Sequence, residues 1–200
     1  MKVLFILISI ILIGCATESE KEKTPQEPSK EAKIIEYLQN INKFEADVIV
    51  TYFSNKNINK YRMLQQVESM VGYTITITEP ERVAGNITIA TAEGIMQKNT
   101  RLNLSFSQEA RDSNVSSSII LTNFVDTFLS SSDKIINDHG DIIKLTVKLD
   151  GDNLYAAASS LWLDRETLTP KRLNTYDIDN GLRIEVIFLS INIERGDYNL

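Results

Sequence analysis

Apolar and polar residues alternate along most of the chain beyond residue 40, which is the pattern of strands that bury one face. In the run 44–53, for example, every second residue from Phe44 to Tyr52 is apolar. Residues that favour turns separate these runs, and Asn180-Gly181 is typical of a tight hairpin turn. The pattern predicts antiparallel strands over 44–53, 60–71, 73–78, 86–90, 95–98, 102–106, 142–149, 155–163, 172–177 and 182–193.

Two segments instead place their apolar residues at helical spacing. The first is predicted over 30–42, behind Ser29 as the helix N-cap, and its apolar face consists of Ile34, Ile35, Leu38 and Ile41. The second is predicted over 117–130, and its apolar face consists of Ile120, Leu121, Phe124, Val125, Phe128 and Leu129. The sequence therefore predicts a mainly β fold of the α+β class, in which a curved antiparallel sheet carries two helices on one side.

The first 14 residues have the pattern of a secretory signal peptide. Lys2 precedes an apolar run over 3–13 that is too short to span a bilayer stably. The run ends in Leu-Ile-Gly before Cys15, which resembles a bacterial lipobox, so we expect cleavage before Cys15 and a diacylglycerol on its thiol. Two or three acyl chains would hold the protein at the extracytoplasmic face of the bacterial or forespore membrane. The alternative is an ordinary signal, or a short anchor, that happens to contain a cysteine.

Residues 15–29 form a polar segment behind the signal peptide. After Cys15 they consist mainly of Glu, Lys, Ser, Thr, Gln and Pro, with no large apolar residue. Such a segment cannot bury enough apolar surface to fold, so we expect a disordered tether. The chain is thus divided into a signal peptide over 1–14, a lipidated tether over 15–29 and one folded domain over 30–200.

Charge and the scarcity of reactive side chains exclude several functions. The 200 residues include 21 Lys and Arg against 27 Asp and Glu, with no dense basic stripe, so we do not expect nucleic-acid binding. Cys15 is the only cysteine and His139 the only histidine. The folded domain therefore lacks a Cys/His zinc cluster, a disulfide and a Cys–His catalytic pair. We predict no catalytic residue, no bound metal and no cofactor.

Three polar clusters remain as candidate sites, and each has an ordinary structural explanation. His139 lies among aspartates in the run 137–141, which suggests a metal or a general base, but a solvent-exposed turn residue is the expected role. Residues 150–153 resemble part of a calcium loop without its later Glu, and we expect a hairpin turn. Asp164 and Glu166 could form a glycosidase pair, yet their spacing at a strand end favours turn residues.

The last third of the chain carries a resemblance to a known family. Residues 161–173 contain the pattern W-L-D-x-x-T-L-x-P-K, and the region before them runs from a helix into a long strand and then shorter strands. Over about residues 30–195 the chain resembles the LolA/LolB/LppX-like lipoprotein-localisation superfamily. The resemblance implies an incomplete antiparallel β-barrel with its helices packed on the concave side.

Within that superfamily, the lipobox, the polar tether and the segment 118–129 resemble the clostridial germination lipoproteins. This resemblance implies a non-catalytic spore protein that binds and activates an N-acetylmuramoyl-L-alanine amidase, which prepares the cortex peptidoglycan for lytic enzymes. Two alternatives stay open. One is a lipid or lipoprotein carrier that holds acyl chains in the half-barrel, and the other is a cell-wall hydrolase.

Four aromatic residues are the candidate lining of a binding surface. We expect Phe124, Phe128, Tyr155 and Trp162 to line the concave face of the sheet, either as plain core packing or around a cavity that accepts a lipid or a partner. Unpaired edge strands are a second candidate surface. They could add a strand from another chain, or form a homodimer by strand exchange.

Overall fold

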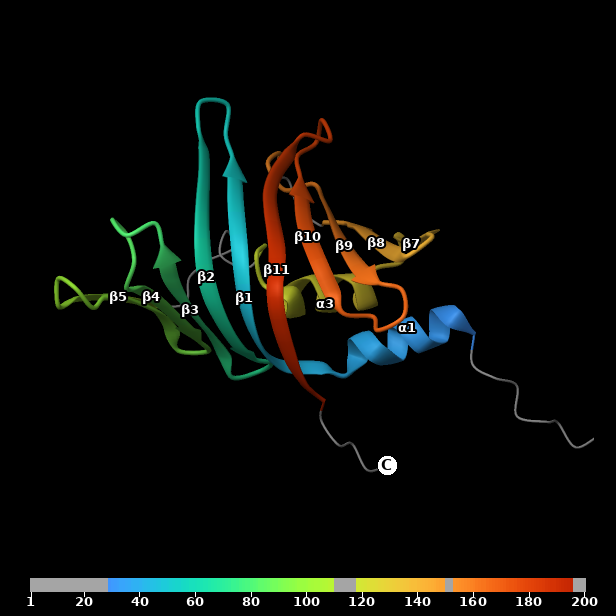
Figure 1. Ribbon diagram of the computed structural model, residues 1–200, viewed down its shortest axis with the longest axis horizontal. Helices are drawn as coiled ribbons and strands as arrows, with labels where there is room; N and C mark the ends of the chain where they lie inside the picture. The colour runs from blue at the N-terminus through green and yellow to red at the C-terminus, as the bar shows by residue number, and fades with distance from the viewer. Residues whose placement is uncertain (1–28, 110–117, 150–152, 196–200) are drawn as a thin grey trace, which may run out of the picture.

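The computed structural model describes residues 29–109, 118–149 and 153–195, and these form one open β-sheet with two helices (Figure 1). The sheet has 11 strands in the order β6-β5-β4-β3-β2-β1-β11-β10-β9-β8-β7, and neighbouring strands are antiparallel. β6 and β7 are its two edges, so the described chain forms an incomplete barrel, as predicted. The strands are β1 (Ile41–Phe53), β2 (Ile58–Glu68), β3 (Gly72–Glu79), β4 (Asn86–Thr91), β5 (Gly94–Asn99), β6 (Leu104–Glu109), β7 (Lys134–His139), β8 (Ile142–Lys148), β9 (Ala158–Asp164), β10 (Pro170–Tyr176) and β11 (Leu182–Arg195).

The first and last strands of the sheet lie side by side at its centre. β1 pairs with β11 along most of its length, with Val48 opposite Phe188 and Val50 opposite Val186. Strands β2 to β6 follow β1 outward on one side, and strands β10 to β7 follow β11 on the other. The β1–β11 pair thus joins the two halves of the sheet. We call strands β3 to β6 the wing.

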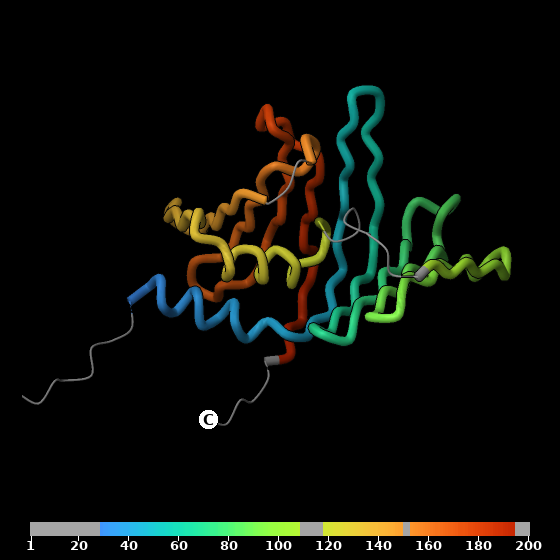
Figure 2. Tube along the Cα trace, turned by 180° about the vertical axis from the view of Figure 1, so that it is seen from behind, coloured from blue at the N-terminus to red at the C-terminus, as the bar shows by residue number. Residues whose placement is uncertain are grey.

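Helices α1 (Lys30–Gln39) and α3 (Leu121–Ser130) lie on the concave side of the sheet (Figure 2). Ser29 caps α1 as predicted, because its hydroxyl accepts a hydrogen bond from the amide of Ala32 at 3.2 Å. α1 ends before residue 42 because Asn40 is its C-cap and Ile41 already begins β1. Within the described ranges, no helix has both the length and the apolar character needed to cross a membrane.

α3 begins at Leu121 and not at the predicted residue 117. Ser118 and Ile119 lie in a turn, and Ile120 is extended, with φ −99° and ψ 124°. Both isoleucines are buried. Their burial explains the longer prediction, since apolar spacing cannot distinguish a buried lead-in from a first helical turn. Residue 117 lies outside the described residues.

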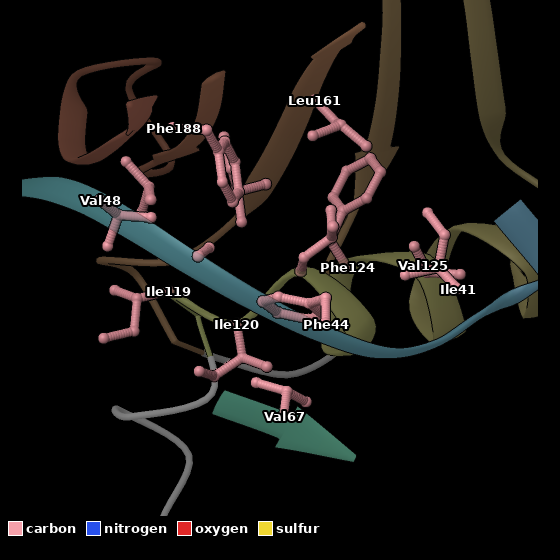
Figure 3. Close-up of a cluster of buried hydrophobic side chains, with 14 of the residues drawn as sticks. Ile41, Phe44, Val48, Val67, Ile119, Ile120, Phe124, Val125, Leu161 and Phe188 are labelled. Atoms are coloured by element: carbon pink, nitrogen blue, oxygen red, sulfur yellow. The ribbon is translucent and has the colours of Figure 1, made fainter. Parts of the chain in front are cut away.

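The core lies between α3 and the strands that it covers. Phe44 of β1, Phe124 of α3 and Leu161 of β9 belong to one apolar cluster and are at most 4% exposed (Figure 3). The rings of Phe124 and Phe128 stack with their centroids 5.7 Å apart. Because full burial of such a side chain contributes about 1.5–3 kcal/mol, these apolar contacts account for the attachment of α3 to the sheet.

The structure contains one strand that the sequence pattern does not predict, β7. It pairs with β8, with Ile136 opposite Leu145 and His139 opposite Ile142. β7 is an edge strand and mostly exposed, so polar residues interrupt the alternation that would have revealed it. His139 is exposed but ends a strand, so its prediction as a turn residue is wrong; the turn begins at Gly140.

Gly72 allows a close approach between β3 and β4 that a larger residue would prevent. Its φ is +142°, and a Cβ atom there would lie 2.0 Å from the carbonyl oxygen of Ala90. We expect Gly72→Ala to lower the free energy of unfolding by about 3 kcal/mol or more, because the two strands must separate. Urea unfolding followed by circular dichroism measures the loss.

Gly140→Ala is the matched control. Gly140 also has a left-handed φ, +71°, but nothing lies within 4 Å of the position of its Cβ. This variant should lower the free energy of unfolding by only about 1 kcal/mol, which is the cost of a left-handed conformation for a residue other than glycine. Equal losses in the two variants would contradict the role given to Gly72.

Candidate docking surface on the uncovered wing

In the part of the chain that the structure describes, no helix covers the concave face of the wing towards its edge strand β6. α3 lies across the other half of the sheet, and the wing extends away from it (Figure 2). Strand pairing places one lateral row of side chains on this face, which runs from the centre of the sheet to its edge through Ala46, Gln65, Ile75, Thr88, Gln97 and Phe106. Ala46, Gln65 and Ile75 are at most 6% exposed, whereas Phe106 is 64% exposed. The concave face is therefore still buried where the wing begins, at β3, and becomes exposed towards its edge at β6.

An open hollow of about 470 Å³ occupies this part of the wing. Ile77, Leu104 and Phe106 supply its apolar walls, and both Leu104 and Phe106 are 64% exposed. Asn86 and Asn99 add amide groups and are hydrogen-bonded to each other at 2.5 Å. Large apolar side chains that gather in one exposed hollow are typical of interaction sites. The hollow suits an apolar side chain presented by another chain.

β6 is an edge strand with little of the usual protection against pairing. Its residues 104–108 include neither a charged residue nor a proline, and its one charged residue is Glu109 at its end. Edge strands commonly carry such residues, which stop a further strand from adding to the sheet. At the other edge, β7 does contain Lys134, Asp138 and His139. β6 therefore offers its backbone N–H and C=O groups to an extended segment of another chain.

Two of the four predicted aromatic residues lie on the concave side. Phe124 and Phe128 project from α3 and are 4% and 0% exposed. Both belong to the apolar core, and Lys134 covers the ring of Phe128 with its ammonium group 5.8 Å from the centroid. Of the two roles considered for them, the structure shows core packing.

The prediction that Tyr155 lines the concave face is wrong. β9 begins at Ala158, so Tyr155 belongs to the connection before the strand, and it is 68% exposed. The guanidinium carbon of Arg183 lies 5.5 Å from its ring centroid. The sequence predicts a strand start at Tyr155 because residues 154–157 are apolar and lead directly into β9.

The same prediction is also wrong for Trp162. Leu161 and Leu163 are 0% exposed and point into the core, so Trp162 between them points to the convex face. Its ring lies between two cations, 5.0 Å from the ammonium of Lys144 and 5.8 Å from the guanidinium carbon of Arg172. The four aromatic residues therefore do not form one site.

Asp138, the neighbour of His139, serves as an ion-pair partner. Its carboxylate contacts the ammonium of Lys30, and its Oδ1 atom lies 3.2 Å from Nη1 of Arg165. Asp138 therefore connects α1, β7 and the turn after β9. The hydrogen bond from Lys30 is the main reason that the pKa of Asp138 lies below its ordinary value. In the described ranges, no group of three His, Cys, Asp or Glu residues could hold a metal ion.

Asp164 closes the turn that follows β9, as predicted for it and Glu166. Its carboxylate accepts the amide hydrogens of Thr167 and Glu166, both at 3.1 Å. The Thr167 amide contributes most to holding the pKa of Asp164 below its ordinary value. Residues 150–152 of the predicted hairpin turn lie outside the described residues.

Leu104 and Phe106 are the functional candidates that the sequence analysis missed. They appear there only as apolar positions of a predicted strand. β6 is the last strand before the chain leaves the wing for α3. The run 102–108, which has no charged residue and precedes the next helix in chain order, is the signal that could have identified an open edge.

The open antiparallel half-barrel, with helices on its concave side in the described chain, is a fold of the LolA-like class. A model of the YdcC-like sporulation protein family matches residues 1–194, and the chain belongs to that family. A search of curated proteins gives no match.

Solved structures support the fold. The structure of the CwlD amidase from Clostridioides difficile in complex with the GerS lipoprotein contains a similar chain, at 15% identity and TM-score 0.55, over 86% of this chain and 99% of that one. A conserved protein from Thermus thermophilus is similar at 11% identity and TM-score 0.53, over 84% and 90%. At these identities the likeness concerns the fold.

Phe128 and Trp162 should differ in their contribution to stability. We expect Phe128→Ala to lower the free energy of unfolding by about 3–5 kcal/mol, because it leaves a cavity in the core. Trp162→Ala should lower it by about 1 kcal/mol, because it removes only a half-buried ring between two cations. Urea unfolding of both variants makes the comparison, and an equal loss for Trp162→Ala would contradict its place on the convex face.

Proposed function

We propose that the protein is a membrane-anchored, non-catalytic lipoprotein that binds and activates a cortex peptidoglycan N-acetylmuramoyl-L-alanine amidase during spore germination. The observation that carries this proposal is the exposure of Leu104 and Phe106 on the concave face of β6, an edge strand of the described sheet. Membership of a sporulation family supports the setting. The similar fold in the complex of GerS with the CwlD amidase supports the class of partner.

Docking would use both the edge and the hollow. An extended segment of the amidase adds to β6 through backbone hydrogen bonds, which supply affinity without demanding one particular sequence. A side chain of that segment fills the hollow over Leu104 and Phe106, and this contact supplies specificity. Because the lipoprotein binds only one form of the amidase well, it raises the population of that form. Activation then requires no catalytic residue from the lipoprotein.

The packing beneath α3 favours a protein partner over a lipid. A carrier needs an apolar cavity for acyl chains, but Leu121, Phe124 and Phe128 fill the space between α3 and the sheet and are at most 4% exposed. The hollow on the wing is open to solvent and lies beside a strand edge. Backbone groups at that edge would gain nothing from a hydrocarbon chain.

Phe106→Asp tests the docking surface. A charge in the apolar hollow loses its hydration when a partner binds, so we expect amidase binding to weaken about tenfold or more, with a matching loss of activation. Ser107→Asp is the matched control, because this neighbour on β6 lies on the opposite face of the strand from Phe106 and outside the lining of the hollow. Size-exclusion chromatography with light scattering, together with release of peptides from cortex peptidoglycan, measures both effects.

Three results of that experiment would reject the proposal. They are the absence of a complex between the wild-type protein and its amidase, full activity of Phe106→Asp, and a lipid in place of a protein on the wild-type chain. The same light scattering reports whether the lipoprotein alone forms a homodimer by strand exchange. We propose that such a dimer would compete with the amidase for β6.

The proposed anchor is a lipid on Cys15, which holds the domain at the extracytoplasmic face of the membrane through the tether 15–29. We expect Cys15→Ala to abolish incorporation of labelled palmitate and to release the protein from the membrane fraction. Ser9→Ala, in the apolar run, is the control and should keep the label. An unlabelled wild-type protein would contradict the anchor.

A further inference from the structure

A second hollow, of about 640 Å³, lies where three connections meet at one end of the sheet. It is lined by residues of the β1–β2 turn, by the segment before β9 and by the first residues of β11. The β1–β2 and β10–β11 turns project at the end of the sheet away from α1 (Figure 1). The lining shares no residue with that of the hollow on the wing. The two sites can therefore be occupied independently.

Arg183 joins these three connections. Its Nε atom donates to Asp177 Oδ2 at 2.6 Å and its Nη1 atom donates to Asn55 Oδ1 at 3.0 Å. Its guanidinium also lies against the ring of Tyr155, with its central carbon 5.5 Å from the centroid. The walls of the hollow are thus held in place before any ligand arrives, which lowers the free-energy cost of binding.

Asp177 positions Arg183. Its carboxylate is buried and also accepts the amide hydrogens of Asp179, at 3.0 Å, and of Gly181, at 2.6 Å. Burial acts to raise the pKa of Asp177, but the bonds from Gly181 and Arg183 together hold it below its ordinary value. The carboxylate therefore stays ionised and is fully engaged inside the protein.

The hollow offers more donors than acceptors. The side-chain oxygen of Asn55 accepts from Arg183, and that of Asn153 accepts the amide hydrogen of Tyr155 at 3.0 Å. The side-chain NH₂ groups of Asn55 and Asn153 therefore face no acceptor in these two bonds and can donate to a ligand. Arg183 uses two of its five N–H groups in the two bonds described above. Lys56 adds an ammonium group to the lining. This chemistry suits a ligand that is anionic and rich in oxygen acceptors.

Tyr155 narrows the class of ligand. Its ring is 68% exposed, so it presents an apolar surface beside these donors. A sugar ring matches that combination, because its C–H face can lie on an aromatic ring while its oxygens reach neighbouring donors. The cations at Lys56 and Arg183 match a carboxylate. We infer that this hollow binds a sugar that carries a carboxylate.

The source of such a sugar follows from the proposed function, on which this part of the inference rests. An N-acetylmuramoyl-L-alanine amidase adds water across the amide bond between muramic acid and the peptide. The C–N bond breaks, the peptide leaves with a free amine, and the lactyl group of the sugar keeps a carboxylate. The hollow would therefore bind the product of the partner enzyme and hold the complex on glycan strands that have lost their peptides.

The test is a titration of the full chain, in detergent and without amidase, with N-acetylmuramic acid. N-acetylglucosamine is the matched sugar, since it lacks the lactyl carboxylate. Calorimetry or ligand-observed NMR at low salt should show N-acetylmuramic acid binding about tenfold tighter, the effect of one charge-assisted contact. Higher salt should reduce the difference, because the cations are near the surface.

Variants with exposed side chains locate the site without disturbing the fold. Tyr155→Ala and Lys56→Gln should each weaken binding of N-acetylmuramic acid about tenfold. Leu154→Ala, which removes an exposed neighbour outside the hollow, and Lys60→Gln, which removes an exposed charge on β2, are the matched controls and should bind as the wild type does. Equal binding of the two sugars, no binding, or no effect of the first two variants would overturn the inference.

The outcomes separate this inference from the proposed function. Phe106→Asp should bind N-acetylmuramic acid normally, because Phe106 lines the other hollow. Loss of sugar binding with normal amidase activation would reject the sugar site alone. Sugar binding without an amidase complex would reject the proposed function and support a site for acidic sugars.

Discussion

The packing of α3 against the centre of the sheet is the contact on which the rest of the structure depends. An open sheet has an apolar face to bury, and α3, which contacts β1 and β8, places Phe124 and Phe128 in the apolar cluster on that face. α3 has 10 residues and is thus only about 15 Å long. Because neighbouring strands lie about 4.8 Å apart, a helix of that length spans only about three strands and cannot extend over the edge of the wing.

Near its edge, the wing of the described chain lacks the second layer that helices provide on the rest of the sheet. A partner protein can supply that layer. On β3, the innermost strand of the wing, Ile75 is buried by the protein itself, whereas Phe106 on the edge strand, in the same lateral row, remains exposed. Strand pairing and the close approach at Gly72 hold the wing together in place of a core. A partner strand on β6 would extend the sheet and cover Phe106 in one step. Binding of a partner would therefore be driven by the burial of apolar side chains, the same interaction that stabilises the core of the protein.

At the end of the sheet, polar contacts hold the second hollow in place, as apolar contacts hold α3 on the sheet. Asp177 and Arg183 join turns that are far apart in the sequence, and they leave a surface rich in donors. On an acidic protein with net charge −6, such a local arrangement matters more than the overall balance. One surface for an enzyme and another for its product would suit a tethered protein that keeps the enzyme on its substrate.

The sequence by itself determined most elements of the fold, because alternation, helical spacing and caps are local properties. The Ser29 cap, the strand from Phe44 and the core residues Phe124 and Phe128 all follow from it. Periodicity does not say which of two faces is covered or which strand lies at an edge. The convex position of Trp162 and the exposure of Phe106 were therefore decided only by the tertiary structure, through strand register and the limited reach of α3.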